Sequence, residues 1–274
     1  MRLLISLSLA IASFQVHGQS LIEQIAGKAS SGEVGQARAL IDSAMQGADS
    51  NNIAMWYFQG YVYKELYKKN QGLEAKKYGD VAIRALTKCM QAEGEENADY
   101  TSQSERLLVY LLGQYFNEAA VNISARSYEI AQSFFQVYEE YMALIDTRQL
   151  QMAGVKFYKL LASTYALHAA ENSEEAIILY RKAIEANEHI MVFNEESFYA
   201  HYNIGSLSYT LSKIDDPDVS TKWLDKALLY LKKAEVFEDG RGTEAAKALL
   251  AVYREVGNTE MVKEYEEKLK DAEK

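Results

Sequence analysis

The sequence has little cysteine and little proline: among its 274 residues there is one of each. A single cysteine rules out an internal disulfide, so packing alone must stabilise the fold. One proline and 15 glycines are too few for a turn-rich all-β chain. Ala, Leu, Glu, Lys and Tyr instead fill long stretches that hold no helix breaker. The composition therefore predicts an all-α protein.

Positive charge is also scarce. The 29 Lys and Arg residues face 39 Asp and Glu residues, which gives a formal net charge of -10. A surface with this balance repels phosphate backbones and anionic lipid headgroups. We therefore expect neither nucleic-acid binding nor peripheral membrane binding.

Only one stretch is apolar enough to suggest a membrane or an export signal. It runs from Leu3 to Phe14, after the single cation Arg2. As a helix it would span about 18 Å, short of the about 30 Å of a bilayer core. We interpret residues 1–18 as a cleaved signal peptide, with a membrane anchor as the alternative. No cysteine follows the run to carry a lipid. We expect an exported protein without membrane insertion, in the periplasm, with secretion from the cell as the alternative.

Two residue patterns recur along the rest of the chain. The first places Trp56, Gly60 and Tyr63 at i, i+4 and i+7, on one face of a helix. Gly60 has no side chain, so a partner helix can approach closely there. The second pattern starts with a small residue and has a large one at i+4, as in Ala82 and Leu86. Together the two patterns predict pairs of helices over approximately residues 20–47, 53–92, 103–145, 152–188, 196–238 and 243–271.

The first pattern returns around Gly113, Ala162, Gly205 and Leu250. The two patterns resemble the tetratricopeptide repeat, W-x-x-L-G-x-x-Y followed by A-x-x-x-F. The resemblance implies one helical-repeat domain over residues 19–274, built as a right-handed α-solenoid of five to six antiparallel helix hairpins. In layout the chain is similar to exported repeat proteins of Bacteroidetes, most of which have no assigned function.

The repeat spacing is longer than that of the family. Successive matched small residues lie more than 40 positions apart, against a family unit of about 34 residues. The excess lies between the two patterns of one pair. Either the helices are longer than in the family, or the turns between them hold loops.

The resemblance also implies a concave groove lined by first helices of the pairs. The residues at the matching positions include Tyr57, Tyr61, Lys64, Tyr110, Gln114, Asn117, Lys156, Lys159, Tyr199, Tyr202 and Tyr209. Tyrosine suits a binding surface because it joins a large apolar body to a polar tip. We expect a non-catalytic scaffold of the cell envelope that binds a peptide or a partner protein. Two alternatives stay open: these tyrosines pack between repeats, or the protein is a glycan-binding accessory.

No residue pattern argues for catalysis or for a metal. His168 is expected near a helix end, His189 in a linker and His201 in the core, and no zinc motif or phosphate-binding loop joins them. Cys89 occupies a small-residue position where a buried, inert thiol is expected. The acidic run from Asp215 to Asp218 lacks the ligand spacing of a calcium loop and suits a solvated turn. We expect no enzyme, no cofactor and no metal.

Overall fold

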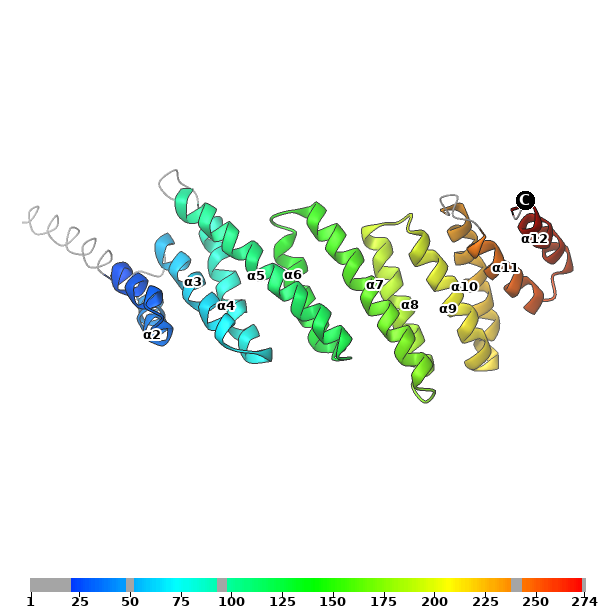
Figure 1. The fold of residues 1–274 in the computed structure, drawn as a ribbon, viewed down its shortest axis with the longest axis horizontal. Coiled ribbons are helices and arrows are strands. Elements are labelled where there is room, and N and C mark those ends of the chain that lie inside the picture. The colour runs from blue at the N-terminus through cyan, green and yellow to red at the C-terminus, as the bar shows by residue number, and fades with distance from the viewer. Residues whose placement is uncertain (1–20, 48–51, 93–97, 238–242, 273–274) are drawn as a thin grey trace, which may run out of the picture. The chain divides into compact units, whose positions relative to one another are not determined.

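The computed structural model describes residues 21–47, 52–92, 98–237 and 243–272 (Figure 1). Every regular element in these ranges is an α-helix, so the predicted all-α class is confirmed. The signal peptide expected over residues 1–18 lies outside the described residues. The helices cover residues 21–30, α2 (Val34–Met45), α3 (Ile53–Lys69), α4 (Gly72–Met90), α5 (Ala98–Ser124), α6 (Tyr128–Met142), α7 (Thr147–Glu171), α8 (Ala176–Phe193), α9 (Phe198–Ile214), α10 (Pro217–Val236), α11 (Glu244–Glu255) and α12 (Thr259–Ala272).

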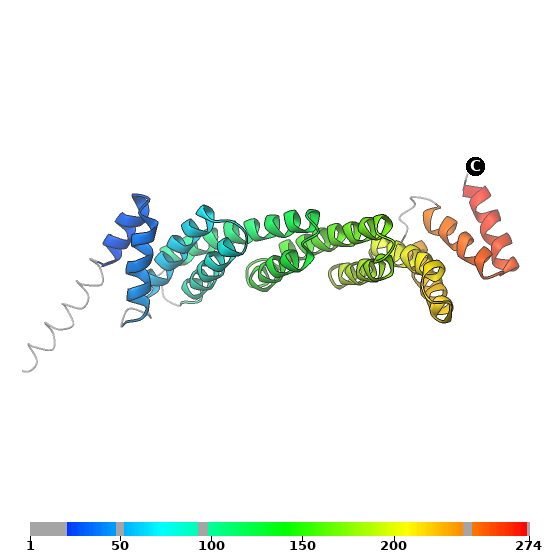
Figure 2. The same cartoon turned by 90° about the horizontal axis from the view of Figure 1, so that it is seen from below.

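The chain forms two compact units, residues 1–115 and residues 116–274, with the boundary inside α5. In the first unit α3 packs against α2 and against α4. In the second unit each helix from α6 to α12 packs mainly against its neighbours in sequence, and Figure 2 shows this order within the unit. The single repeat domain expected over residues 19–274 stays a prediction.

Side-chain caps start several of these helices. Asn52, Asp146, Ser197 and Asp216 each accept a hydrogen bond from a backbone N–H two or three residues later, which satisfies a donor that the helix itself leaves unpaired. Pro217 follows directly in the first turn of α10, where its missing N–H costs nothing. Each cap thus fixes where its helix begins.

The long repeat spacing is explained by long helices and not by loops. α3 and α4 have 17 and 19 residues and are separated only by residues 70–71. α9 and α10 have 17 and 20 residues and are separated only by residues 215–216. Turns this short force the two helices of a pair to run in opposite directions.

Close approach at the small-residue positions is present in two places and missing in a third. A Cβ atom added to Gly60 would lie 2.5 Å from Cγ of Leu86, and one added to Gly205 would lie 2.6 Å from Cγ of Leu231. Both contacts agree with the predicted role of these glycines. At Gly113, by contrast, no described atom outside the local helix backbone lies within 4 Å of the Cβ position.

The expected positions of the core thiol and of one histidine are confirmed. His201 is 3% exposed, its ring lies 5.2 Å from that of Phe237, and its Nδ1 lies 2.9 Å from the carbonyl oxygen of Ser197. Cys89 is fully buried, and burial raises the pKa of its thiol. Both side chains therefore serve packing.

The position expected for His189 is wrong. We expected it in a linker after residue 188, yet α8 continues to Phe193. Because residues 188–193 contain neither glycine nor proline, nothing in the sequence ends the helix earlier. His168 does lie in the last turn of α7, as expected.

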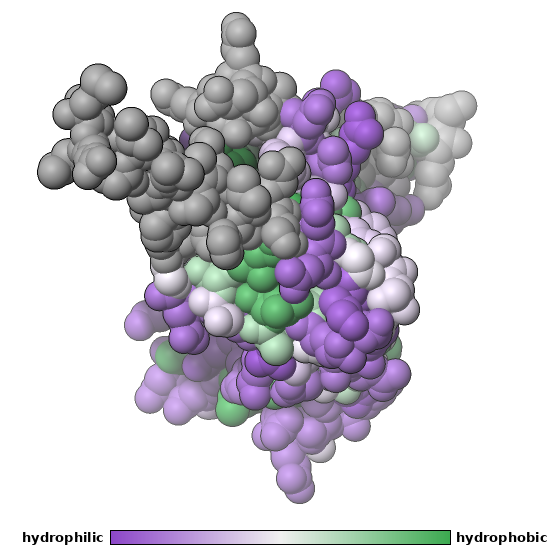
Figure 3. Space-filling view, turned by 90° about the vertical axis from the view of Figure 1, so that its left-hand side faces the viewer, coloured by the Kyte–Doolittle hydropathy of each residue, from purple (hydrophilic) through white to green (hydrophobic). Residues whose placement is uncertain are grey.

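Within the described residues, no helix combines the length and the apolar composition that a membrane span requires. Figure 3 shows one side of the structure, where hydrophilic residues in purple lie beside and below a smaller hydrophobic area in green. Such single apolar areas are usual on protein surfaces.

Candidate functional site

The predicted groove residues of α3 cluster in the first unit. The ammonium of Lys64 lies 4.4 Å from the ring centre of Tyr61, and the rings of Tyr57 and Tyr61 are 6.5 Å apart. The hydroxyl of Tyr57 donates to Oε1 of Gln103 on α5 at 2.8 Å. Lys64 is only 7% exposed and pairs with Glu65 at 2.6 Å, so its charge is already neutralised inside the unit.

Four other predicted groove residues reach solvent. Tyr110 is 42% exposed and Gln114 is half-buried on the part of α5 that belongs to the first unit. In the second unit, Asn117 and Lys156 are exposed. Among the described residues of its own unit, none of the four forms a hydrogen bond, ion pair or ring contact with another predicted groove residue.

In the second unit the first helices α7 and α9 do bring two predicted residues together. The ammonium of Lys159 lies 4.7 Å from the ring centre of Tyr199. Beside this pair is a hollow of about 240 Å³, which we call the α7–α9 hollow. It is lined by three apolar and four polar residues from α7, α8 and α9: Ala162, Ala166, Leu207, Ser163, Asn187, Tyr199 and Asn203.

Sequence reasoning identified Tyr199 but not Asn187. Asn187 lies in the interior of α8, directly after Ala186, and is 1% exposed. Asparagine is unfavourable inside helices and is seldom fully buried. An asparagine in the interior of a helix was therefore a usable signal.

Tyr202 and Tyr209 pack between helices. Both contact the core that α10, α11 and α12 share. The hydroxyl of Tyr209 lies 3.4 Å from the carbonyl oxygen of Ala251 and 3.3 Å from the carboxylate of Glu255, and the ammonium of Lys213 lies 4.1 Å from its ring centre. These two tyrosines therefore pack between helices, as the alternative to a binding groove had it.

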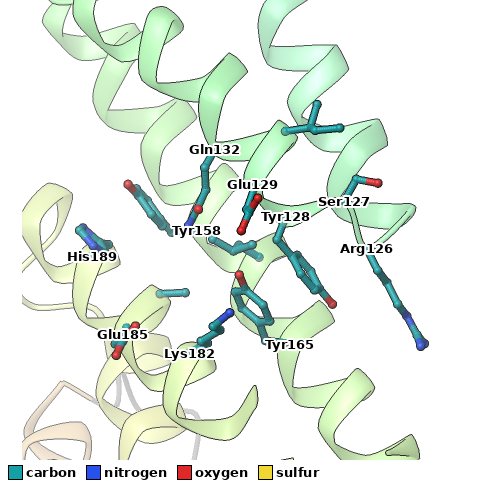
Figure 4. Close-up of a pocket in the computed structure, with 13 residues that line it drawn as sticks. Arg126, Ser127, Tyr128, Glu129, Gln132, Tyr158, Tyr165, Lys182, Glu185 and His189 are labelled. Atoms are coloured by element: carbon teal, nitrogen blue, oxygen red, sulfur yellow. The ribbon is translucent and has the colours of Figure 1, made fainter. Parts of the chain in front are cut away.

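A larger pocket, of about 540 Å³, lies among α6, α7 and α8 and the turn before α6 (Figure 4). Tyrosine and histidine rings form much of its wall. The rings of Tyr128 and Tyr165 are 4.1 Å apart, and those of Tyr158 and His189 stack at 4.6 Å with 10° between their planes. Tyr158 and Tyr165 lie four residues before and three after Ala162, at the two large-residue positions of the first repeat pattern, which predicts packing and gives no indication of a pocket.

The polar side chains of this pocket include hydrogen-bond donors and acceptors, and both positively and negatively charged groups. In Figure 4 the side chains of Glu129, Tyr165 and Lys182 point toward its centre. Burial raises the pKa of Tyr158 and of Tyr165 to about 12, so both hydroxyls stay protonated at neutral pH. The hydroxyl of Tyr128 lies 3.3 Å from Nδ1 of His168. Such an arrangement can bind a polar ligand.

We expected the acidic turn between α9 and α10 to be solvated, but its first residue, Asp215, is packed against neighbouring side chains. The carboxylate of Asp215 is 8% exposed and accepts hydrogen bonds from Arg181 at 2.6 Å and from the indole N–H of Trp223 at 2.8 Å. Its pKa is lowered, chiefly by the hydrogen bond from Arg181. Across the described part of the chain, no group of three His, Cys, Asp or Glu side chains could hold a metal ion.

Comparison with known proteins adds no relative: no protein-family model matches the chain, and no curated protein matches it. The resemblance to the tetratricopeptide repeat therefore depends on the recurring residue patterns alone.

Proposed function

We propose that this protein is a non-catalytic scaffold of the cell envelope, and that it binds a peptide segment of a partner protein on the first helices of its second unit. In this proposal the helix pairs form a right-handed, tetratricopeptide-like α-solenoid of five to six hairpins. Two facts support it: the residue patterns recur along the chain, and each helix of the second unit packs mainly against its neighbours in sequence. That packing is typical of repeat proteins.

The observation that carries the proposal is the pairing of Lys159 with Tyr199 beside the α7–α9 hollow. Together with the hollow, these residues offer an aromatic ring, a cation and a recess lined by apolar and polar side chains within one small area. Extended peptides are bound by such combinations, in which pockets accept side chains and fixed polar groups set the register.

A pull-down from the native cell envelope tests this proposal. Tyr199→Ala removes the ring at the edge of the hollow, and we expect it to lose the partner that the wild-type protein retains. Ile178→Ala is the matched control, because Ile178 is 59% exposed on α8 and lies outside the hollow. Circular dichroism establishes that both variants keep their helices. Equal recovery of the same partner by Tyr199→Ala and wild type would refute the site.

Glycan capture is the second candidate function, and the pocket of Figure 4 is the observation that favours it. The aromatic rings of the pocket can stack on the apolar faces of a sugar. Its polar side chains can form hydrogen bonds with the sugar hydroxyl groups: Glu129, Glu185, Gln132 and Lys182. A glycan array with wild type and His189→Ala separates the two functions. Signals that His189→Ala weakens would favour the glycan; an array without signal would leave the peptide as the ligand.

Export is a separate part of the proposal and has its own test. Cleavage of residues 1–18 predicts that the mature protein starts at Gln19. N-terminal sequencing of protein isolated from the periplasmic fraction would establish this. A chain that keeps Met1 and stays with the membrane would instead favour the N-terminal anchor.

A further inference from the structure

The hydroxyl of Tyr165 is available to a ligand in the pocket of Figure 4. The residue is only 4% exposed, and its side chain points toward the centre of the pocket (Figure 4). Within the described part of the chain this hydroxyl forms no hydrogen bond, although a buried tyrosine hydroxyl usually has a partner. Because it stays protonated at neutral pH, it can both donate and accept. A ligand therefore meets a fixed hydroxyl for which no other group competes.

The charged groups beside this hydroxyl are of both signs and are not paired with one another. Glu129 and Lys182 point toward the pocket centre (Figure 4), and Glu185 also lines the pocket. None of these three side chains forms an ion pair with a described residue. Arg126 lines the pocket as well, but it pairs with Glu171. The pocket thus presents two carboxylates and one ammonium that a ligand can meet.

These groups favour an uncharged ligand that carries hydroxyl groups. Burial raises the pKa of Tyr165, and Glu185 and Glu129 raise it further, so both carboxylates act at its hydroxyl and would repel an anion. The ammonium of Lys182 lies 5.8 Å from the ring centre of Tyr165 and would repel a cation. A carboxylate only accepts hydrogen bonds and an ammonium only donates them. Two neighbouring hydroxyl groups satisfy both, since one can donate while the other accepts.

The pocket and the α7–α9 hollow lie on different sides of the helices that they share. On α7, Tyr165 lines the pocket and Ala166 lines the hollow. On α8, Ala186 lines the pocket and Asn187 lines the hollow. One residue turns an α-helix by about 100°. A ligand in the pocket therefore leaves the hollow open to a peptide.

We propose that the pocket of Figure 4 binds a neutral sugar unit through two neighbouring hydroxyl groups, and that Tyr165 determines this specificity. One sugar hydroxyl donates to Glu129, its neighbour accepts from Lys182, and the hydroxyl of Tyr165 forms a hydrogen bond with one of the two. The stacked rings of Tyr158 and His189 supply an apolar wall for the sugar ring. A volume of about 540 Å³ is sufficient for such a unit. This inference rests on the second candidate function, glycan capture, and specifies the class of sugar captured.

NMR titration of the purified protein with small sugars tests the inference. The probes are the methyl glycosides of glucose, galactose and mannose, which are neutral, with glucuronate, glucosamine and free phenylalanine as an anion, a cation and a zwitterion. We expect a neutral glycoside to bind most tightly. Tyr165→Phe keeps the ring but loses the hydroxyl, and we expect it to bind that glycoside about three- to tenfold more weakly.

Tyr253→Phe is the matched control. Tyr253 is 3% exposed, its hydroxyl also has no hydrogen-bond partner among the described residues, and it lies outside the pocket. We expect this variant to keep the wild-type affinity. Lys182→Met changes an exposed residue of the pocket and provides a second variant should Tyr165→Phe not fold. It should also weaken binding of the neutral glycoside about three- to tenfold.

Removal of single sugar hydroxyl groups completes the design. The deoxy analogue that lacks the partner of Tyr165 should bind wild type about three- to tenfold more weakly and should lose nothing further with Tyr165→Phe. Glycan-array signals that Tyr165→Phe leaves unchanged, or that come only from charged sugars, would overturn this inference and leave glycan capture standing. Preferential binding of phenylalanine would overturn it as well. An array without signal, together with no binding of any glycoside, would overturn both and leave the peptide site untouched.

Discussion

The ammonium of Lys159 on α7 lies 4.7 Å from the ring centre of Tyr199 on α9, so the two first helices are joined at the surface by a cation and an aromatic ring. Such pairs are worth about 0.5–1 kcal/mol where water reaches them. The contact also fixes the ring of Tyr199 at the edge of the α7–α9 hollow. The ring is thereby positioned before any ligand arrives, which lowers the entropy cost of binding.

Exchange of Tyr199 for Leu should change the NMR chemical shifts of the Lys159 side chain. In the wild-type protein the ring current of Tyr199 should shift the ε-methylene protons of Lys159 upfield, and Tyr199→Leu should abolish this shift. Tyr199→Phe keeps the ring and should keep the shift. Two-dimensional NMR of selectively labelled lysine measures it. Unshifted Lys159 protons in the wild type would mean that the contact is not formed in solution.

Two glycines should respond in opposite ways to the same substitution. Gly60→Ala places a Cβ 2.5 Å from the buried side chain of Leu86 and should lower the free energy of unfolding by about 1–3 kcal/mol. Gly113→Ala meets no such neighbour and should raise it by about 0.5–1 kcal/mol, because alanine favours the helix. Urea unfolding followed by circular dichroism measures both. A stabilising Gly60→Ala would show that α3 and α4 do not approach closely.

The hydrogen bond between Arg181 and Asp215 predicts that the free energy of unfolding falls at acidic pH. The hydrogen bond from Arg181 lowers the pKa of Asp215 below its ordinary value of 3.8, so the folded protein holds the carboxylate ionised at a pH where the unfolded chain protonates it. The stabilisation is thus complete above about pH 4 and is lost as the pH falls further. At pH 7, Asp215→Asn should lower the Tm by roughly 2–4 °C.

Fluorescence of Trp223 reports the same contact, because its indole N–H donates to Asp215. The chain has two tryptophans, so the measurement uses a Trp56→Phe background. Emission of Trp223 should change on acidification before the helices melt, and in Asp215→Asn the change should be absent. An identical acid response in both proteins would contradict the assignment.

The tyrosines of the Figure 4 pocket should titrate late and reduce stability in alkali. Burial raises the pKa of Tyr158 and of Tyr165 to about 12, whereas a tyrosine of the unfolded chain titrates near 10. The folded state therefore holds more protons over this interval, and the free energy of unfolding should fall as the pH rises from about 10 to about 12. Tyrosinate absorbance of Tyr158→Phe and Tyr165→Phe should each lack one late-titrating group. Loss of an early-titrating group instead would contradict the buried position.

Helical periodicity predicted the class of fold and several of its contacts. The recurrence of small and large residues at i, i+4 and i+7 depends on local geometry, and that is why it correctly indicated a close approach of the partner helix at Gly60, where Leu86 is the neighbour. Helix ends were less well predicted. α7 begins at Thr147, not near residue 152, because Asp146 caps it, and α8 continues past residue 188 because no breaker follows.

The candidate site was only partly predictable, since it depends on which helices meet. Tyr199 and Tyr209 both lie on α9, and the sequence predicted both as groove residues. In the structure Tyr209 packs against α11, whereas Tyr199 lines the hollow. Lys64 gave no sign of burial, because lysine is rarely buried unless it is paired, as it is here with Glu65. Long-range packing decided each of these cases.

The most direct test of the scaffold function is site-specific photo-crosslinking in native cells. A photo-reactive residue replaces Tyr199 at the hollow in one strain and Ile178, exposed on α8, in another. Mass spectrometry identifies what each position captures. The account predicts one protein captured from position 199 and not from position 178, joined through an extended segment of that partner. The same captured proteins at both positions, or none at position 199 from a well-expressed protein, would contradict it.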